Sequence, residues 1–185
     1  MKANFLFTML FSALLFIGCS TENEEDFLIE SSSAKLSKDI SSAKMVKRHF
    51  KMKAYGDWFL VVAESTECNG LPQYSIQGQG NATHMGAITV EGKICAGPPE
   101  LYFISGKYTS ANGDELTWES TEVFFDENGI YAGGVFQFVE GNGRFSNVEG
   151  TFTVNEALII AEIDEQTGFP LGGTWSNNGS GTITY

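Results

Sequence analysis

The chain has 185 residues, of which 42% are hydrophobic and 13% aromatic, and its formal net charge at pH 7 is −12. This length and apolar content suit one globular domain and exclude a chain that is disordered throughout. Because the acidic excess repels phosphate backbones, we do not expect the protein to bind nucleic acid.

The first element in chain order is an export signal. Lys2 supplies a positive charge, residues 5–17 form an apolar run, and Gly18 directly precedes Cys19. The run is shorter than the roughly 20 residues that span a bilayer, and its layout is that of a signal peptide ending in a lipobox. We therefore expect residues 1–18 to be removed and Cys19 to carry lipid, palmitate included, that anchors the protein in a membrane. An ordinary cleaved secretory peptide is the alternative.

An acidic cluster follows the cysteine. Glu22, Glu24, Glu25 and Asp26 lie in the stretch 19–46, which has little regular pattern and is predicted to be a tether. The cluster resembles the acidic export signal that follows the lipid-bearing cysteine in surface lipoproteins of Bacteroidetes. That resemblance implies an outer membrane lipoprotein on the cell surface rather than on the periplasmic face. A solvated tether without any sorting role is the alternative.

Charge is distributed unevenly along the rest of the chain. Residues 27–53 hold seven basic and two acidic residues, whereas residues 54–185 hold three basic and seventeen acidic ones. The basic stretch includes Lys47, Lys51 and Lys53. Either these lysines contact anionic lipid or lipopolysaccharide, or they form the solvent face of a first strand and discourage pairing at its edge.

Two cysteines remain once Cys19 is assigned to lipid. In an oxidising compartment the expected state of Cys68 and Cys95 is a disulfide. A catalytic or metal-binding thiol is the alternative, although no partner motif accompanies either residue. We expect no metal site and no cofactor.

From residue 47 onward the sequence has the period-two alternation of β-strands. Phe50, Met52 and Ala54 alternate with polar residues, and Asn-Gly pairs at 112–113 and 128–129 predict hairpin turns. The predicted strands cover residues 47–62, 74–78, 85–94, 101–109, 115–124, 130–139, 147–163 and 172–185.

These strands define one all-β domain, residues 47–185. Eight antiparallel strands with glycine corners can close into a barrel whose interior is filled by side chains or holds one small ligand. An eight-stranded antiparallel closed barrel is therefore our prediction for the fold. A sandwich of two sheets is the alternative.

Four glycine-rich segments, at residues 78–86, 109–116, 140–150 and 181–185, carry a family resemblance. In this order they resemble exported bacterial β-proteins related to the allene oxide cyclase and dirigent barrels. Gly143, Phe145 and Gly150 match the barrel corner of those families, although Glu140 and Asn142 stand where the family pattern has Gly and Thr. The resemblance covers roughly residues 48–185 and implies an allene oxide cyclase-like barrel. No catalytic residue can be carried over.

Five residues are candidates for ligand binding. Aromatic side chains could line an apolar pocket in a barrel of this class, and Phe136 and Phe138 share one face of a strand. The imidazole of His84 can donate, accept or carry a proton and so suits a polar site, but it also suits a structural bond to a backbone carbonyl. Glu119 suits either acid–base work or a solvated strand face. The candidates are His84, Trp118, Glu119, Phe136 and Phe138.

The sequence therefore predicts a membrane-anchored lipoprotein that binds a small apolar ligand or serves as a cell-envelope interaction module. An isomerase or cyclase that uses a polar residue in the barrel cavity is the alternative, and we do not favour an enzyme. The membrane, through the lipid on Cys19, and a small apolar ligand are the expected partners. The sequence indicates no oligomeric state.

Overall fold

The computed structural model describes residues 45–97 and 101–185. The predicted signal peptide, Cys19 and nearly all of the predicted tether lie outside these residues. Within them, no helix is long and apolar enough to cross a membrane. The elements are β1 (Lys47–Val62), η1 (Thr66–Cys68), β2 (Gln73–Ala82), β3 (Gly86–Gly97), β4 (Leu101–Ser110), β5 (Glu115–Phe125), β6 (Tyr131–Gly141), η2 (Gly143–Phe145), β7 (Glu149–Ile163) and β8 (Pro170–Thr184).

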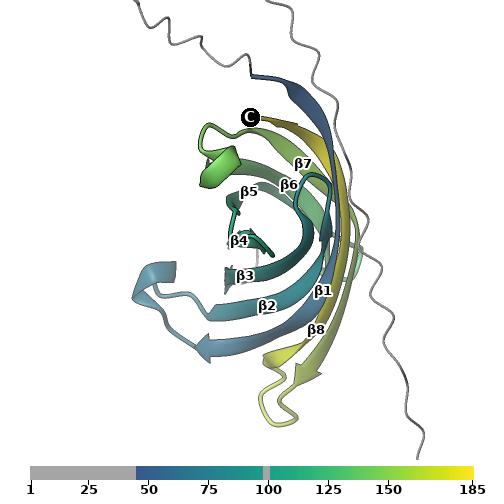
Figure 1. Cartoon of the computed structure of the whole chain (residues 1–185). Helices are drawn as coiled ribbons and strands as arrows, with labels where there is room; N and C mark the ends of the chain where they lie inside the picture. Colours follow the sequence, from purple (N-terminus) through teal and green to yellow (C-terminus); the bar gives the residue numbers. More distant parts are fainter. Residues whose placement is uncertain (1–44, 98–100) are drawn as a thin grey trace, which may run out of the picture. The chain divides into compact units, whose positions relative to one another are not determined.

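The eight strands form one closed antiparallel barrel in which each strand pairs with its neighbours in sequence (Figure 1). The barrel closes where β1 pairs with β8, from Lys47 opposite Thr184 to Phe59 opposite Gly172. The predicted barrel is confirmed, and the two-sheet sandwich is excluded. The two Asn-Gly pairs lie in the turns between β4 and β5 and between β5 and β6, where Gly113 and Gly129 have positive φ angles.

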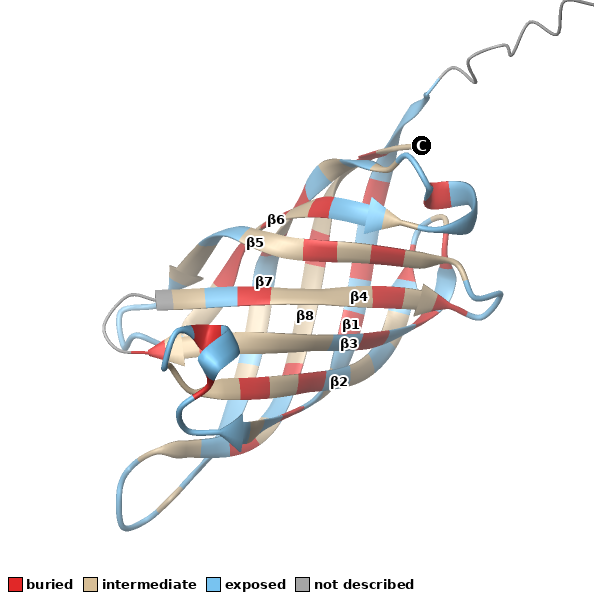
Figure 2. Cartoon of the chain, turned by 90° about the vertical axis from the view of Figure 1, so that its left-hand side faces the viewer, coloured by how far each residue is buried: buried red, intermediate tan, exposed pale blue. Residues whose placement is uncertain are grey.

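Alternation along each strand separates the inside of the barrel from the outside (Figure 2). On β1 the buried residues are Phe50, Met52, Ala54 and Trp58. The odd-numbered residues from 49 to 59 point outward, because successive side chains of a strand lie on opposite faces. The barrel interior is thus one apolar core that receives side chains from every strand.

Aromatic side chains fill one end of this interior. Phe50 lies with its ring centroid 5.0 Å from that of Phe138 and 5.5 Å from that of Phe152. Phe145, on η2, is fully buried beside them. We call this packed end, which also carries the β2–β3 and β4–β5 turns, the closed end. Its η2 corner depends on Gly143, whose φ of 56° suits glycine.

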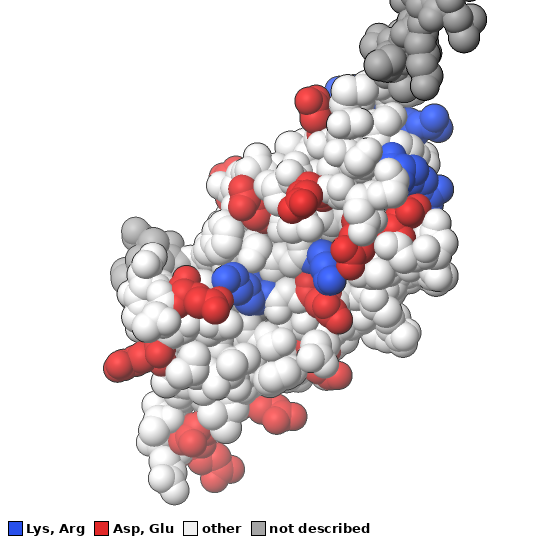
Figure 3. Space-filling view, turned by 60° about the vertical axis from the view of Figure 1, so that its left-hand side comes forward, with Lys and Arg blue, Asp and Glu red and all other residues white. Residues whose placement is uncertain are grey.

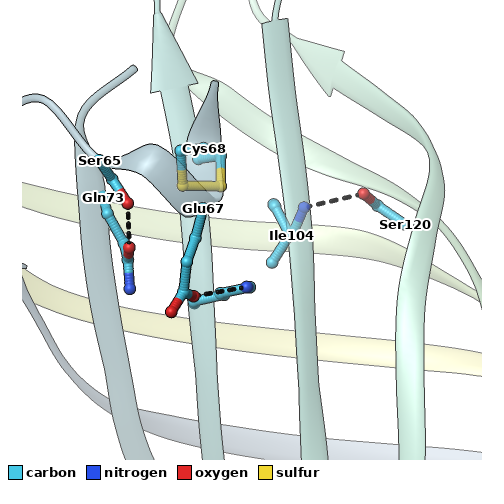
Figure 4. Close-up of a disulfide and its surroundings, with 8 residues drawn as sticks. Ser65, Glu67, Cys68, Gln73, Ile104 and Ser120 are labelled. Atoms are coloured by element: carbon cyan, nitrogen blue, oxygen red, sulfur yellow. Dashed lines mark hydrogen bonds and ion pairs between the residues drawn. A yellow bond between two sulfur atoms is a disulfide. The ribbon is translucent and has the colours of Figure 1, made fainter. Parts of the chain in front are cut away.

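The opposite end, the mouth, carries the loop from β1 to β2 and the β5–β6 and β7–β8 turns. Here the β5–β6 hairpin loses backbone pairing with both neighbours. The β4–β5 ladder stops at Ser105 opposite Glu119, and the β6–β7 ladder spans only residues 134–137 and 151–154. Beyond the end of the β4–β5 ladder, the Ile104 N–H donates to Ser120 Oγ at 2.9 Å (Figure 4).

A disulfide fixes the β1–β2 loop at the mouth. Cys68 on η1 is bonded to Cys95 on β3, with Cα atoms 5.3 Å apart, as the sequence predicted. Both cysteines are buried, and Lys93 Nζ lies 3.1 Å from Glu67 Oε2 beside them (Figure 4). The loop is therefore held against β3 by a covalent bond and a solvent-exposed ion pair.

Replacing Cys68 and Cys95 together by alanine should lower the free energy of unfolding by about 3 to 4 kcal/mol. The crosslink joins residues 27 positions apart and so removes conformations from the unfolded chain. Urea denaturation of the two proteins measures the difference, and wild-type protein unfolded with a reductant should match the double variant. Equal midpoints for all three samples would contradict a stabilising role for the crosslink.

Candidate functional site

A cavity of about 260 Å³ lies inside the barrel, on the mouth side of the packed aromatic end. Its walls receive side chains from all eight strands. Met52, Val90 and Phe152 lie at its deep end, and Ile130 and Pro170 line it where it reaches the mouth. The site is therefore a single chamber that is closed at one end of the barrel and accessible from the other.

The chamber is made of apolar and aromatic groups without a formal charge. No Asp, Glu, Lys, Arg or His occurs among the described residues that line it. Its polar atoms belong to one asparagine, three tryptophans and four tyrosines: Asn177, Trp58, Trp118, Trp175, Tyr74, Tyr102, Tyr108 and Tyr131. An environment of this kind favours an uncharged ligand, because an ion would lose its hydration without gaining a partner.

Three of these polar atoms are buried without a hydrogen-bond partner in the described part of the chain: Trp58 Nε1, Trp118 Nε1 and Asn177 Oδ1. By contrast, Trp175 Nε1 donates to the Asp57 carbonyl at 3.1 Å, and the Tyr74 hydroxyl donates to the Pro170 carbonyl at 3.2 Å. A buried polar group without a partner costs about 1 to 3 kcal/mol. All three unpartnered atoms belong to residues that line the chamber.

Inward-facing glycines make room for two of the indole rings. A Cβ atom added at Gly106 would lie 2.7 Å from Trp118 Cζ2, and one added at Gly78 would lie 2.6 Å from Trp175 Cζ2. Each tryptophan therefore lies over a part of the wall that has no side chain. Large and small residues on neighbouring strands thus set the position of the rings and the shape of the remaining space.

The tyrosines of the chamber are neutral hydrogen-bonding groups. Burial, and to a smaller extent the neighbouring Tyr131, raises the pKa of Tyr108 well above its ordinary value of 10.0. Burial also raises the pKa of Tyr131 and of Tyr102. Because the ionised form is disfavoured, these phenols offer O–H groups and lone pairs but no charge at neutral pH.

The structure brings some of the sequence-predicted site residues together. Trp118 and Phe136 both line the chamber, with ring centroids 5.5 Å apart in an edge-to-face arrangement. Phe138 also points inward, but it packs against Phe50 and Phe152 in the closed end and does not line the chamber.

The two ionisable candidates lie elsewhere. His84, in the β2–β3 turn, has its Nε2 atom 2.9 Å from the carbonyl oxygen of His49, the structural arrangement considered from the sequence. Glu119 lies beside Trp118 on β5 and faces outward, where its Oε1 accepts a bond of 2.6 Å from Gln137 Nε2. Neither residue lines the chamber. No cluster of three or more His, Cys, Asp or Glu side chains suited to a metal occurs within residues 45–97 and 101–185.

Sequence reasoning missed the tyrosines and Asn177. Tyr74, Tyr102 and Tyr108 occupy inward positions of β2 and β4, where the alternation of each strand could have placed them. Asn177 gives no such signal, since an asparagine in a glycine-rich strand is typical of an outward or turn position. Its place inside the barrel follows from its register beside Trp175 on β8.

No family model and no curated protein matches the sequence. Two similar solved structures are those of the pterocarpan synthase dirigent proteins PsPTS1 and GePTS1. The first is 13% identical with a TM-score of 0.44, and the match covers 76% of this chain and 95% of that chain. The second is 11% identical with a TM-score of 0.45, covering 76% and 92% respectively. At these identities the likeness concerns the fold alone.

We expect the stability of the protein to fall as the pH rises above about 10, in part because of Tyr108. Its folded-state pKa is raised by burial, so its contribution is intact below the unfolded-state pKa and is lost as the unfolded chain ionises at higher pH. Urea denaturation at about pH 9, 10 and 11 should show a shallower decline for Tyr108→Phe than for wild type. Tyr55→Phe, at an exposed position on β1, is the matched control. An unchanged slope in Tyr108→Phe would contradict this assignment.

Proposed function

We propose that the barrel binds a small, uncharged, largely apolar molecule in its chamber. The observation that carries the proposal is the combination of an apolar cavity with three buried polar atoms that have no partner within the described residues. A purely structural core would gain stability by filling the space and pairing or removing those atoms. A ligand can fill the space, and it can pair those atoms where the side chains that line the chamber shift to meet it.

The size of the chamber limits the ligand. About 260 Å³ corresponds to the volume of roughly nine liquid waters at about 30 Å³ each. This is slightly below the range of about 300 to 1,000 Å³ that is usual for drug-sized ligands. We therefore infer a molecule with one ring or a short branched chain.

The polar atoms define where oxygen should lie in such a molecule. The two indole N–H groups, of Trp58 and Trp118, require an acceptor, whereas Asn177 Oδ1 requires a donor. A hydroxyl group satisfies either kind of partner. A neutral ring or short-chain compound with one or two hydroxyl or carbonyl groups is the ligand class that fits.

Binding can be tested with p-cresol as a neutral probe and 4-methylbenzoate as its charged counterpart. All three tryptophans of the chain line the chamber, so intrinsic fluorescence reports on its contents. We expect p-cresol to change the emission and 4-methylbenzoate to leave it unchanged. Ala96→Phe, which places a ring in the chamber, should weaken p-cresol binding by about tenfold or more, equivalent to about 1.4 kcal/mol.

Ala87→Phe is the matched control, since Ala87 lies on the exposed face of the same strand. It should bind p-cresol as the wild-type protein does. Equal binding by Ala96→Phe and Ala87→Phe would show that the probe binds outside the chamber. If p-cresol does not bind to the folded wild-type protein, the result would favour the alternative role of a cell-envelope interaction module.

We further propose that the chain is a lipoprotein of the outer membrane, exposed on the cell surface and anchored through Cys19. The support is the lipobox and the acidic cluster that follows it. The diacylglyceryl group that a lipobox cysteine carries as a thioether supplies more than one acyl chain, as stable anchoring requires, and the new amino group of Cys19 can be acylated too. The barrel would then be held outside the membrane by the residues between Cys19 and β1.

Cys19→Ala should abolish incorporation of labelled palmitate and release the protein from the membrane fraction. Cys68→Ala is the matched control, because Cys68 forms the disulfide with Cys95; it should retain the label. Protease treatment of intact cells should degrade the wild-type protein if it faces outward. Labelled palmitate in the Cys19→Ala variant would refute the anchor, and protection from protease would refute surface exposure.

A further inference from the structure

Four basic residues gather on the first half of β1, beside the closed end of the barrel. Lys47, Arg48, Lys51 and Lys53 are all exposed. Figure 3 shows blue atoms at the upper right of the view, with red atoms beside them, whereas its lower end carries red atoms and no blue ones. We call these four residues the basic stripe.

The stripe differs from the other basic residues in its pairing. Each of the other three described basic residues forms an ion pair. Lys93 Nζ lies 3.1 Å from Glu67 Oε2, Lys107 Nζ lies 2.8 Å from Glu115 Oε1, and Arg144 Nε lies 2.9 Å from Asp114 Oδ2. Within the part of the chain that the structure describes, no residue of the basic stripe forms an ion pair. The nearest acidic residues on the packed strands are Glu149, in register with Lys47 across Thr184, and Glu156, in register with Lys53 across Asn178.

Protection of a strand edge does not explain the stripe. Lys53 lies between two paired strands, opposite Asn81 on β2 and Asn178 on β8. Residues 47–51 of β1 extend past the end of β2, and the β2–β3 turn bonds to the backbone of that overhang at His49 and Lys51. There the Thr83 N–H donates to the Lys51 carbonyl at 2.9 Å, and His84 Nε2 lies within hydrogen-bond distance of the His49 carbonyl.

Amide and hydroxyl groups surround the lysines, together with the carboxylate of Glu156, which accepts a bond of 2.7 Å from Asn178 Nδ2. A shallow groove on the outer face of the barrel brings Lys51 and Lys53 together with Asn81, Thr83 and Ser180. Ammonium groups flanked by amides and hydroxyls can bind the oxygens of phosphate groups. The groove belongs to β1, β2, β7 and β8 and lies outside the chamber.

The mouth has the opposite charge. Glu64 and Glu67 lie in the β1–β2 loop, and further acidic residues lie in the β5–β6 and β7–β8 turns. Bonds from backbone N–H groups, of which that of Ile130 contributes most, lower the pKa of Asp126 in the β5–β6 turn. The unpaired basic residues of the stripe therefore lie towards the closed end, whereas the loops of the mouth are acidic.

We propose that the basic stripe docks on an anionic membrane surface, with phosphate-bearing headgroups as the groups it binds. The charge complementarity of the stripe and the position of β1, directly after the tether, carry this inference. The orientation of the docked barrel rests on the proposed anchor, whereas the attraction between the basic stripe and anionic headgroups does not. Docking in this way directs the mouth of the chamber away from the membrane.

The test uses the lipidated full-length mature protein in vesicles of phosphatidylcholine, with or without one-third phosphatidylglycerol, and a dansyl-labelled lipid. Energy transfer from the native tryptophans to dansyl should be greater on the anionic vesicles. It should fall to the level of the neutral vesicles at about 1 M salt, where screening acts within about 3 Å.

Lys51→Gln combined with Lys53→Gln should lower the ratio of docked to free barrels by about fivefold for each lysine. Lys93→Gln combined with Lys107→Gln is the matched control, because it removes the same charge from lysines that are paired on the barrel. Equal transfer on neutral and anionic vesicles, or an equal loss in the two double variants, would overturn the proposal.

Failure of the anchor is distinguishable from failure of docking. A chain without an anchor would not sediment with neutral vesicles, yet an intact basic stripe would still bring it to anionic ones. An anchored chain without docking would sediment with both and show the same energy transfer on each. If the chamber does not bind p-cresol, neither sedimentation with vesicles nor energy transfer to dansyl would change.

Discussion

Closure of the sheet by β1 and β8 is the constraint on which the rest of the structure depends. The two strands pair over thirteen register positions, from Lys47 opposite Thr184 to Phe59 opposite Gly172. This pairing gives every strand two neighbours and leaves one interior that all eight must share. Once it forms, a side chain is either inside the barrel or outside it. The chamber, the basic stripe and the two ends of the molecule all follow from that division.

Unequal filling of the interior produces the chamber. At the closed end, Phe50, Phe145 and Phe152 are almost completely buried and pack against one another or against further aromatic rings. Towards the mouth, shorter side chains such as Ala96 and Ala161 line the wall, and the β5–β6 hairpin has no backbone ladder with β4 or β7. Trp58 and Trp118, which line the remaining space, have buried indole N–H groups without a hydrogen-bond partner in the described part of the chain, and such groups are costly for a folded protein. The combination is typical of a binding site rather than of an imperfect core.

The sequence was sufficient for the strands, the Asn-Gly turns and the disulfide, because each depends on local alternation, turn chemistry or cysteine number. It was not sufficient for the site, which depends on contacts across the barrel. Trp118 lies over Gly106 because β4 and β5 pair in one particular register. His84 bonds to a carbonyl 35 residues away because β1 extends past the end of β2. No pattern within either segment specifies these contacts.

Charge and aromatic walls would act together in selecting the proposed ligand. An anion would be repelled at the acidic mouth, where hydrogen bonds, chiefly from backbone N–H groups, lower the pKa of Asp126 and of Asp164. A cation would be attracted to the mouth and to the aromatic faces. It would, however, leave the N–H groups of Trp58 and Trp118 without an acceptor. A neutral molecule with an acceptor oxygen satisfies both conditions, because it passes the mouth without repulsion and pairs the donors inside. The polarity of the two ends therefore supports the same ligand class as the lining of the chamber.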